Sequence, residues 1–503
     1  MRTKKAIMNY LTELIPQIII LVLGFFKVKV FLTCLGEELV GLFQLFNQLL
    51  FYLSLLDGGA GTIIGYYLYK PISEKNNKSI GSILSGTIKF FTIIAVAILV
   101  LGLVLDLNIM FFIKDSTVAP IVIKGMFIIL LVANMLSYFY TPYTLFMDAK
   151  QERYKYNVII QPIFIVRSIL EIVLVLIYKN LFVVLIMQLV ITIIQNIVVR
   201  IIFKKNYNDI NLKEKPDFNF LKKVKTIIPH KIGTIIANNI DIVIVSKFIS
   251  ITRVVTYTSY LYIIEVLQKF VDLIAGSVIP GVGNVLVTDE KKAYNLFNEY
   301  NYFLYYVATV LCVPLFMSIS IFIRIYYGEN IVASDAVALM FIILLFYRII
   351  RNAYSTFINA AGLFKETIIC VFLEATINLV LSLILVQHIE MVGLLLGTII
   401  AGILSEYVIK PNILNKKIFK QKKFKYYGES ILFIAIFAIL LIVFKLCFSG
   451  FVIFNLLQWF IYSFIIFIIN FVLVTFVYKI MNKCAFFDRV FGLLKEKISH
   501  GKS

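Results

Sequence analysis

Long apolar stretches alternate with short polar segments along almost the whole chain. Each stretch holds about 20 mainly apolar residues, the length that an α-helix needs to cross a bilayer core of about 30 Å. The pattern predicts fourteen membrane-spanning helices, and therefore an all-α polytopic membrane protein. The predicted spans are 8–32, 39–69, 82–105, 121–146, 157–178, 181–203, 227–249, 255–281, 299–325, 335–359, 366–387, 390–409, 429–448 and 455–479.

The second predicted span, 39–69, is too long for one straight crossing. It contains the run Asp-Gly-Gly-Ala-Gly at 57–61. Adjacent glycines and a short polar side chain favour a break in a helix. We therefore expect this helix to break at the run or to continue past the membrane surface.

Composition excludes a soluble protein and disfavours an enzyme. Of the 503 residues, 61% are hydrophobic and only 15% are charged, whereas soluble domains carry about 25% charged residues. The longest segment outside the predicted spans, about 200–226, is rich in Lys and Asn and has no apolar core for a catalytic domain. The chain has no P-loop, HExxH or GxSxG motif, and its five cysteines are scattered. We expect no ATP hydrolysis, no metal site and no cofactor.

The charges predict the orientation in the membrane. Lys and Arg number 48 against 28 Asp and Glu, a net charge of +20. If the N-terminus is cytoplasmic, 33 basic residues fall in inner segments, eight in outer segments and seven within spans. Basic residues concentrate on the cytoplasmic side of membrane proteins and attract anionic lipid there. Both termini are therefore predicted to be cytoplasmic, and nucleic acid is not an expected partner.

Two pairs of matching landmarks predict an internal repeat. Ile15-Pro16 opens the first span and Ile228-Pro229 opens the seventh, an offset of 213. The run 144–149 follows the fourth span, and a similar run at 356–361 follows the tenth, an offset of 212. Six duplicated spans make two lobes related by an axis along the membrane normal, an arrangement typical of transporters. The predicted parts are an N-terminal lobe at 1–203, a basic cytoplasmic linker at 204–226, a C-terminal lobe at 227–409, a second basic linker at 410–428, a helix pair at 429–480 and a cytoplasmic tail at 481–503.

Three segments carry a family resemblance. The run 41–61 resembles the second helix of O-antigen-type polysaccharide flippases. The run 240–248, followed by Val-Thr-Tyr at 255–257, resembles their seventh and eighth helices. The run 359–365, followed by Asn378-Leu379, is similar to their tenth-to-eleventh junction. In their order these segments resemble the oligosaccharidyl-lipid branch of the multidrug, oligosaccharidyl-lipid and polysaccharide (MOP) exporter superfamily over about residues 1–410.

The resemblance implies a V-shaped fold of two lobes and a specific activity. A flippase of this family moves an undecaprenyl-diphosphate-linked oligosaccharide repeat unit from the inner to the outer leaflet of the bacterial cytoplasmic membrane, by alternating access. The product feeds cell-surface polysaccharide such as O-antigen or capsule. The implied partners are the lipid-linked substrate, membrane lipid, and a polysaccharide polymerase with glycosyltransferases.

Three alternatives stay open on sequence. The run 22–27 matches the first-helix pattern of lipid II flippases, with Lys27 in place of an arginine, but further arginines of that family have no basic counterpart here. An ion-coupled multidrug exporter on the same fold would favour a compact apolar cavity with few cations. A membrane polymerase or ligase would need a sizeable outer loop with catalytic residues, and every predicted outer loop is short.

Flipping requires cations that hold the diphosphate inside the membrane, because an unpaired charge there costs at least about 2.5 kcal/mol. The candidates lie within or at the ends of spans of both lobes: Lys27, Arg167, Lys269, Arg348 and Arg351. Arg348 and Arg351 are spaced i, i+3 and share a helix face suited to two phosphate groups. The alternative for this pair is snorkelling to the interface or pairing with a lipid headgroup.

Without an ATP site, flipping needs an ion gradient or removal of the product. The acidic residues in spans without an obvious local partner are Glu13, Asp57, Asp241 and Glu374, which are candidates for coupling to H⁺ or Na⁺. Asp57 has the alternative of a helix-breaking turn, and Asp241 that of polar packing. Arg167 and Glu171 are spaced i, i+4. Either they form an ion pair that lowers the cost of burial, or the Glu171 carboxylate alternates between Arg167 and a coupling ion.

Overall fold

The computed structural model describes the chain apart from residues 1, 224–239, 289, 422–424 and 484–503, and apart from the side chains at 2–11, 13–15, 18, 287, 288, 290 and 291. Within these limits every regular element is a helix, as the apolar pattern predicts. Ten helical runs among the described residues are long and apolar enough to cross a membrane. Phe364–Phe419 contains two predicted spans, and Ile19–Ser73 contains the second predicted span and the part of the first from residue 19 onward. The chain is therefore a multi-pass membrane protein.

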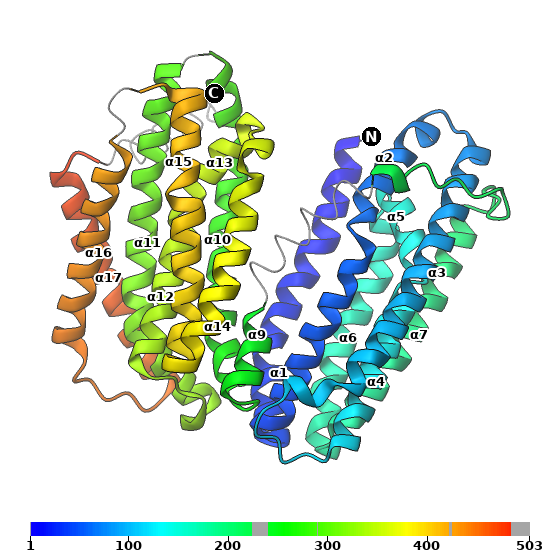
Figure 1. Ribbon diagram of the computed structural model, residues 1–503, viewed down its shortest axis with the longest axis horizontal. Helices are drawn as coiled ribbons and strands as arrows, with labels where there is room; N and C mark the ends of the chain where they lie inside the picture. Colours follow the sequence, from blue (N-terminus) through cyan, green and yellow to red (C-terminus); the bar gives the residue numbers. More distant parts are fainter. Residues whose placement is uncertain (1, 224–239, 289, 422–424, 484–503) are drawn as a thin grey trace, which may run out of the picture. The chain divides into compact units, whose positions relative to one another are not determined.

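The helices group into two compact units (Figure 1). The N-terminal unit is Met1–Ile235 with Asn239–Val255, and the C-terminal unit is Ile236–Asn238 with Thr256–Ser503. The described end of the seventh predicted span, α9 (Asp241–Ile244) and the π-helix η3 (Val245–Ile249), thus groups with the N-terminal unit. The predicted lobe boundary and the C-terminal tail lie largely outside the described residues.

The N-terminal unit is a bundle in which α1 packs along α6 and α4 along α7. Its apolar faces meet in a core that includes an edge-to-face contact of Phe46 with Phe127, with ring centroids 5.5 Å apart. Such aromatic pairs add stability beyond the area they bury. The helices are α1 (Arg2–Leu53), α2 (Ala60–Ser73), α3 (Asn77–Leu107), α4 (Pro120–Ser137), α5 (Thr141–Ala149), α6 (Tyr154–Tyr178) and α7 (Leu181–Asn206).

The predicted break at residues 57–61 is confirmed. A 3₁₀ turn, η1 (Ser54–Asp57), precedes Gly58 and Gly59, whose φ angles of 58° and 74° lie in the left-handed region that glycine tolerates. The Asp57 carboxylate accepts a hydrogen bond from the Gly59 N–H at 2.7 Å. The turn separates α1 from α2, and α1 has a further break at Gly36, between the first two predicted spans.

The C-terminal unit incorporates the last two helices into its core. Both α16 and α17 pack against α11, and the buried Asn470 of α17 donates a hydrogen bond to the Thr309 carbonyl at 3.1 Å. The described part of the second predicted linker is mostly helical. The elements are α10 (Arg253–Thr288), α11 (Glu290–Tyr327), α12 (Asp335–Ile350), α13 (Asn352–Ala361), α14 (Phe364–Gly402), η5 (Ile403–Tyr407), α15 (Ile409–Leu414), η6 (Asn415–Phe419), α16 (Tyr426–Phe448) and α17 (Leu456–Ile480).

The two units share an irregularity that matches the predicted repeat. In each unit a long apolar helix is interrupted and followed by a short second helix: α4 by α5, and α12 by α13. The short helices end at Ala149 and Ala361, 212 positions apart. The offset read from the sequence therefore recurs in the backbone.

Backbone and side-chain hydrogen bonds within the N-terminal unit hold the segment 108–119 in place. The Lys114 N–H donates to the Ser246 carbonyl at 3.1 Å, and the Ile251 N–H donates to the Lys114 carbonyl at 3.2 Å. The Glu38 carboxylate accepts hydrogen bonds from the hydroxyls of Ser116 and Thr117, each at 2.6 Å. These bonds hold the segment against α1 and η3.

Gly41 allows α1 to approach this region closely, and substituting it tests the packing. A Cβ atom at Gly41 would lie 2.2 Å from the Ile251 carbonyl oxygen. We expect Gly41→Ala to destabilise the protein by about 1–3 kcal/mol, because the atom it meets belongs to the backbone and cannot rotate away. The apparent melting temperature of the purified protein measures the effect. The control Gly276→Ala on α10, where a Cβ meets nothing within 4 Å, should not lower it; equal melting temperatures would contradict the close packing at Gly41.

Candidate functional site

Buried charge in the N-terminal unit centres on Glu171 of α6, whose side chain is 2% exposed. Its carboxylate accepts hydrogen bonds from three helices: from Lys27 Nζ of α1 at 3.0 Å, Arg167 Nε of α6 at 2.9 Å and Gln188 Nε2 of α7 at 2.7 Å. Their spacing of i, i+4 places Arg167 and Glu171 on one helix face, and the packing of α1 on α6 brings in Lys27. We call these four residues the N-terminal cluster.

The N-terminal cluster carries a surplus of positive charge. Two cations surround one carboxylate, which leaves one formal positive charge. The carboxylate is inaccessible, whereas the side chains of Lys27 and Arg167 keep 28% and 29% of their surface exposed. A buried carboxylate therefore orients two cations whose outer faces remain available to an anion.

A polar cavity of about 330 Å³ lies beside this cluster, within the N-terminal unit. Arg167 and Gln188 belong to its wall, together with amide, hydroxyl and aromatic side chains of α1, α4 and α7. Polar walls are unusual for a space among membrane helices, where polar side chains are costly and mark functional paths.

The C-terminal unit holds a second cluster, centred on Glu406, whose side chain is 7% exposed. Glu406 pairs with Lys410 one turn later and lies 3.9 Å from Nη1 of Arg351, the residue between α12 and α13. The charges of these three residues and of Arg348 also act on the buried Glu374 of α14. Three cations face two carboxylates, so this C-terminal cluster also has a surplus of one formal positive charge.

The geometry of η5 explains how Glu406 reaches this position. Residues Ile403–Tyr407 form a π-helix, closed by a hydrogen bond of 3.0 Å from the Val408 N–H to the Ile403 carbonyl. One wider turn changes the register of side chains on either side of it, and such turns recur at functional sites. Here Ile403 and Tyr407 line an apolar pocket, while Glu406 pairs with the cations.

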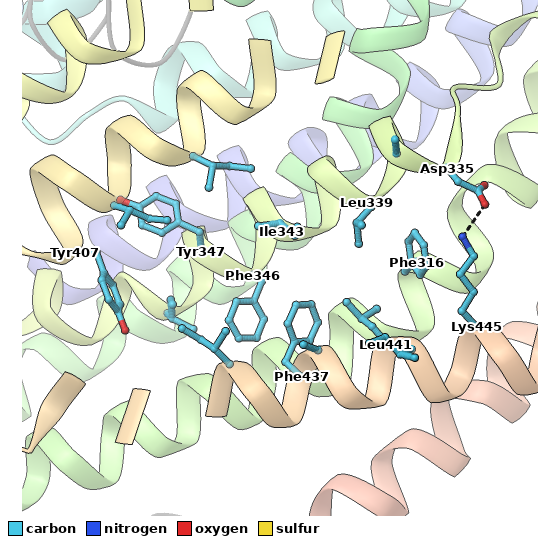
Figure 2. Close-up of a pocket in the computed structure, with 17 residues that line it drawn as sticks. Phe316, Asp335, Leu339, Ile343, Phe346, Tyr347, Tyr407, Phe437, Leu441 and Lys445 are labelled. Carbon is cyan, nitrogen blue, oxygen red and sulfur yellow. Dashed lines mark hydrogen bonds and ion pairs between the residues drawn. The ribbon is translucent and has the colours of Figure 1, made fainter. Parts of the chain in front are cut away.

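That pocket has a volume of about 760 Å³ and lies between α12, the α14–η5 region and α16 (Figure 2). Figure 2 shows Tyr407 and Lys445 toward its opposite ends, with Phe346, Phe437 and Leu441 between them. Lys445 forms an ion pair with Asp335 at 2.9 Å. The wall between these ends is almost wholly apolar, so the pocket suits a hydrocarbon chain or an apolar molecule.

The structure brings together some of the predicted diphosphate-binding residues. Lys27 and Arg167 share the N-terminal cluster, and Arg348 and Arg351 contribute to the C-terminal cluster. Lys269 lies exposed on α10, outside both clusters. Their roles in binding stay predictions.

The four predicted coupling residues lie in different surroundings. The side chain of Glu13, on α1, lies outside the described residues. Asp57 caps the turn before α2. Asp241 is buried at the start of α9. Of the three whose side chains are described, Glu374 alone belongs to one of the two clusters, and coupling through any of the four stays a prediction.

Three cluster members are absent from the sequence prediction: Glu406, Lys410 and Gln188. Glu406 and Lys410 are spaced i, i+4 at the end of the twelfth predicted span, the same signal that identified Arg167 and Glu171. Gln188 has no such signal, because only the packing of α7 on α6 brings it to Glu171.

Comparison with known proteins identifies the fold. No protein-family model matches the chain, and no curated protein matches it in sequence. A solved structure of the lipid II flippase MurJ, in an inward closed conformation, is similar with a TM-score of 0.68 and 18% identity over 93% of this chain and 98% of that one. A multidrug-resistance MATE transporter of the MOP superfamily, in an inward-facing conformation, is similar with a TM-score of 0.62 and 15% identity over 79% of this chain and 96% of that one.

These similarities show the fold. The chain shares its fold with the lipid II flippase MurJ and with a MATE transporter of the MOP superfamily. Both of these similar proteins are named as transporters of the kind that the sequence resemblance leads us to expect.

Proposed function

We propose that this protein is a flippase that moves an undecaprenyl-diphosphate-linked oligosaccharide repeat unit from the inner to the outer leaflet of the bacterial cytoplasmic membrane, by alternating access. The observation that carries the proposal lies in the C-terminal unit. Its cationic cluster and its apolar pocket share the turn η5. Tyr407 of this turn lines the pocket, and Glu406 of the same turn pairs with Lys410 and lies 3.9 Å from Arg351. A ligand that fills both has an anionic head and a long apolar tail.

The two parts suit the two chemistries of such a lipid. The guanidinium of Arg351 offers planar paired donors to a diphosphate. The apolar wall of the pocket can contact a prenyl chain along its length, because prenyl chains are hydrocarbon throughout. The N-terminal cluster has a surplus of one positive charge of its own. A chain that moved only apolar cations would have little use for two buried cationic clusters.

Two other substrates fit part of the structure. Lipid II is also a polyprenyl-diphosphate lipid, and the similarity to MurJ favours it in fold. A multidrug exporter is favoured by the apolar pocket alone, without the charge. We place the oligosaccharide lipid first because the sequence resemblance over 41–61, 240–257 and 359–379 is to polysaccharide flippases.

Binding of a short prenyl diphosphate to the purified full-length chain tests the proposal. We expect geranylgeranyl diphosphate to raise the apparent melting temperature, since a ligand at about one hundred times its Kd stabilises the folded state by about 2.7 kcal/mol. Uncharged geranylgeraniol should raise it less, and Arg351→Ala should remove the difference between them. Stabilisation by ethidium but not by the prenyl diphosphate would instead indicate a drug exporter.

Filling the pocket should weaken recognition of the tail. Ala438 lines the pocket on α16, and Ala438→Phe would place a ring there. If the ring displaces two or three methylene-sized groups, affinity for geranylgeranyl diphosphate should fall by about 2 kcal/mol, or about thirty-fold. Ala435→Phe, one turn earlier on the same helix and outside the pocket lining, is the matched control. Equal affinities of the two variants for geranylgeranyl diphosphate would show that the pocket does not bind the prenyl tail.

Coupling to H⁺ or Na⁺ belongs to the same proposal, and Glu374 is its best-supported candidate. Neutralising Glu374 would change the net charge that faces Arg348 and Arg351, and thus which arrangement of the transporter is stable. In proteoliposomes we expect an imposed H⁺ or Na⁺ gradient to change the flipping rate of the parental chain but not of Glu374→Gln. If the gradient changes both flipping rates equally, coupling acts through another residue. If it changes neither rate, flipping is not coupled to these ions. The proposal also includes two predictions from the sequence. Both termini are cytoplasmic, and the partners are a polysaccharide polymerase and glycosyltransferases.

A further inference from the structure

The polar cavity of the N-terminal unit has a chemistry that the diphosphate does not explain. Two of its hydroxyls donate to carbonyls of their own helices: Ser137 to Asn134 at 2.6 Å and Thr192 to Gln188 at 3.0 Å. Each hydroxyl oxygen then retains lone pairs that accept hydrogen bonds. These acceptors can be paired by a ligand that has donors of its own, which a fully ionised diphosphate or a chloride ion lacks.

Two amides in the cavity wall point to an absent ligand. Gln195 is 3% exposed, and its Nε2 has no hydrogen-bond partner in the described structure. Asn134 Oδ1, also buried, has none either among the described residues. Buried donors and acceptors are nearly always satisfied, and leaving one unpaired costs about 1–3 kcal/mol. One side chain lacks an acceptor and the other a donor, so both could be satisfied by hydroxyl groups.

Charge and shape narrow the class of ligand. The guanidinium of Arg167 uses its Nε on Glu171, which leaves its terminal N–H groups for a planar anion. Aromatic rings of Phe51, Tyr140 and Phe164 also line the cavity, as in sites that stack sugar rings. The volume of about 330 Å³ is at the small end of ligand sites and corresponds to about ten waters. It suits one sugar ring rather than a chain of sugars.

We propose that this cavity is a binding site for a single carboxylated sugar, with Arg167 on the carboxylate and Gln195, Asn134 and the wall hydroxyls on the ring hydroxyls. The inference rests on the proposed function, in which the sugar enters the protein as part of a lipid-linked headgroup. It deepens that function by giving the transporter a selectivity for acidic repeat units. It also assigns Arg167 to the sugar and leaves the diphosphate to the C-terminal cluster.

A fluorescent reporter in the cavity tests the site separately from the prenyl diphosphate. The only tryptophan of the chain, Trp459, lies on α17 in the other unit. In full-length protein that carries Trp459→Phe and Phe164→Trp, the single indole stands in the cavity wall. We expect glucuronate to change its emission with at least tenfold higher affinity than glucose, and acetate to cause no saturable change. Saturation-transfer NMR of glucuronate with the parental chain controls for the reporter substitution.

Two variants separate binding from folding. Gln195→Met keeps the size of the side chain and removes the unpaired amide, so we expect an unchanged or higher melting temperature together with at least fivefold weaker glucuronate binding. Arg167→Met should abolish the preference for glucuronate over glucose, and Arg167→Lys should restore part of it. Equal binding of glucose and glucuronate by the parental chain, or acetate binding as tight as glucuronate, would overturn the proposal. It would leave the prenyl diphosphate test of the C-terminal unit unaffected.

Discussion

Replacing Glu171 by glutamine is expected to destabilise the protein by about 3 kcal/mol. The substitution leaves Lys27 and Arg167 side by side without the carboxylate that both contact at 2.9–3.0 Å. Removing one partner of a buried ion pair costs about 3–5 kcal/mol, because the remaining charge is uncompensated. We expect the lower end, since the two cations keep 28% and 29% of their surface exposed. Unfolding in increasing dodecyl sulfate measures the change.

Two control variants make this expectation specific. Lys27→Met combined with Glu171→Gln restores the surplus of one positive charge, so the double variant should recover part of the lost stability. Glu366→Gln removes a half-buried carboxylate that lies 3.8 Å from the exposed Lys417, and ion pairs at the surface contribute only about 0–1 kcal/mol. A Glu171→Gln protein as stable as the Glu366→Gln protein would show that the N-terminal cluster is not a buried ionic centre.

The second large effect is expected at Arg351, and it concerns transport rather than stability. Arg351→Ala should reduce flipping of the lipid-linked substrate at least tenfold, because each charge-assisted hydrogen bond contributes about 1.5–3 kcal/mol. The protein should remain folded, since Glu406 keeps its pair with Lys410. Arg351→Lys should impair transport less, because it retains the charge and loses the planar paired donors.

Matched variants again distinguish the site from a general effect of charge. Arg253→Ala removes an exposed basic residue at the start of α10 and should leave the flipping rate unchanged. Arg348→Ala tests the other arginine that the sequence places on the same helix face. Parental transport by a chain lacking both Arg348 and Arg351 would contradict phosphate recognition by the C-terminal cluster.

Much of the fold follows from local sequence signals. Span length alone predicts the helices, because a lipid-exposed backbone must satisfy its hydrogen bonds internally. The break at Gly58-Gly59 follows from the left-handed backbone that two adjacent glycines permit. The repeat offset of 212 follows from two short matching runs, and it recurs at the ends of α5 and α13.

The candidate sites are only partly readable from sequence, since they depend on contacts between helices. A spacing of i, i+4 identifies Arg167 with Glu171 as a pair, but not Lys27 or Gln188 as their neighbours. The apolar pocket leaves no signal, because its wall residues are as apolar as those that face lipid. The π-helical turn η5 is also not predicted by any sequence pattern. In this turn Glu406 lies near Arg351 and Tyr407 lines the pocket.

The most direct test of the account is flipping by the purified full-length chain in proteoliposomes. A fluorescent undecaprenyl-diphosphate oligosaccharide is placed in the membrane, and a membrane-impermeant quencher measures the fraction of headgroups on each side over time. The account predicts that headgroups equilibrate faster with the parental chain than in protein-free liposomes, and that Arg351→Ala returns the rate to the protein-free value. Headgroups that cross no faster than in protein-free liposomes, while the same vesicles move ethidium, would contradict it.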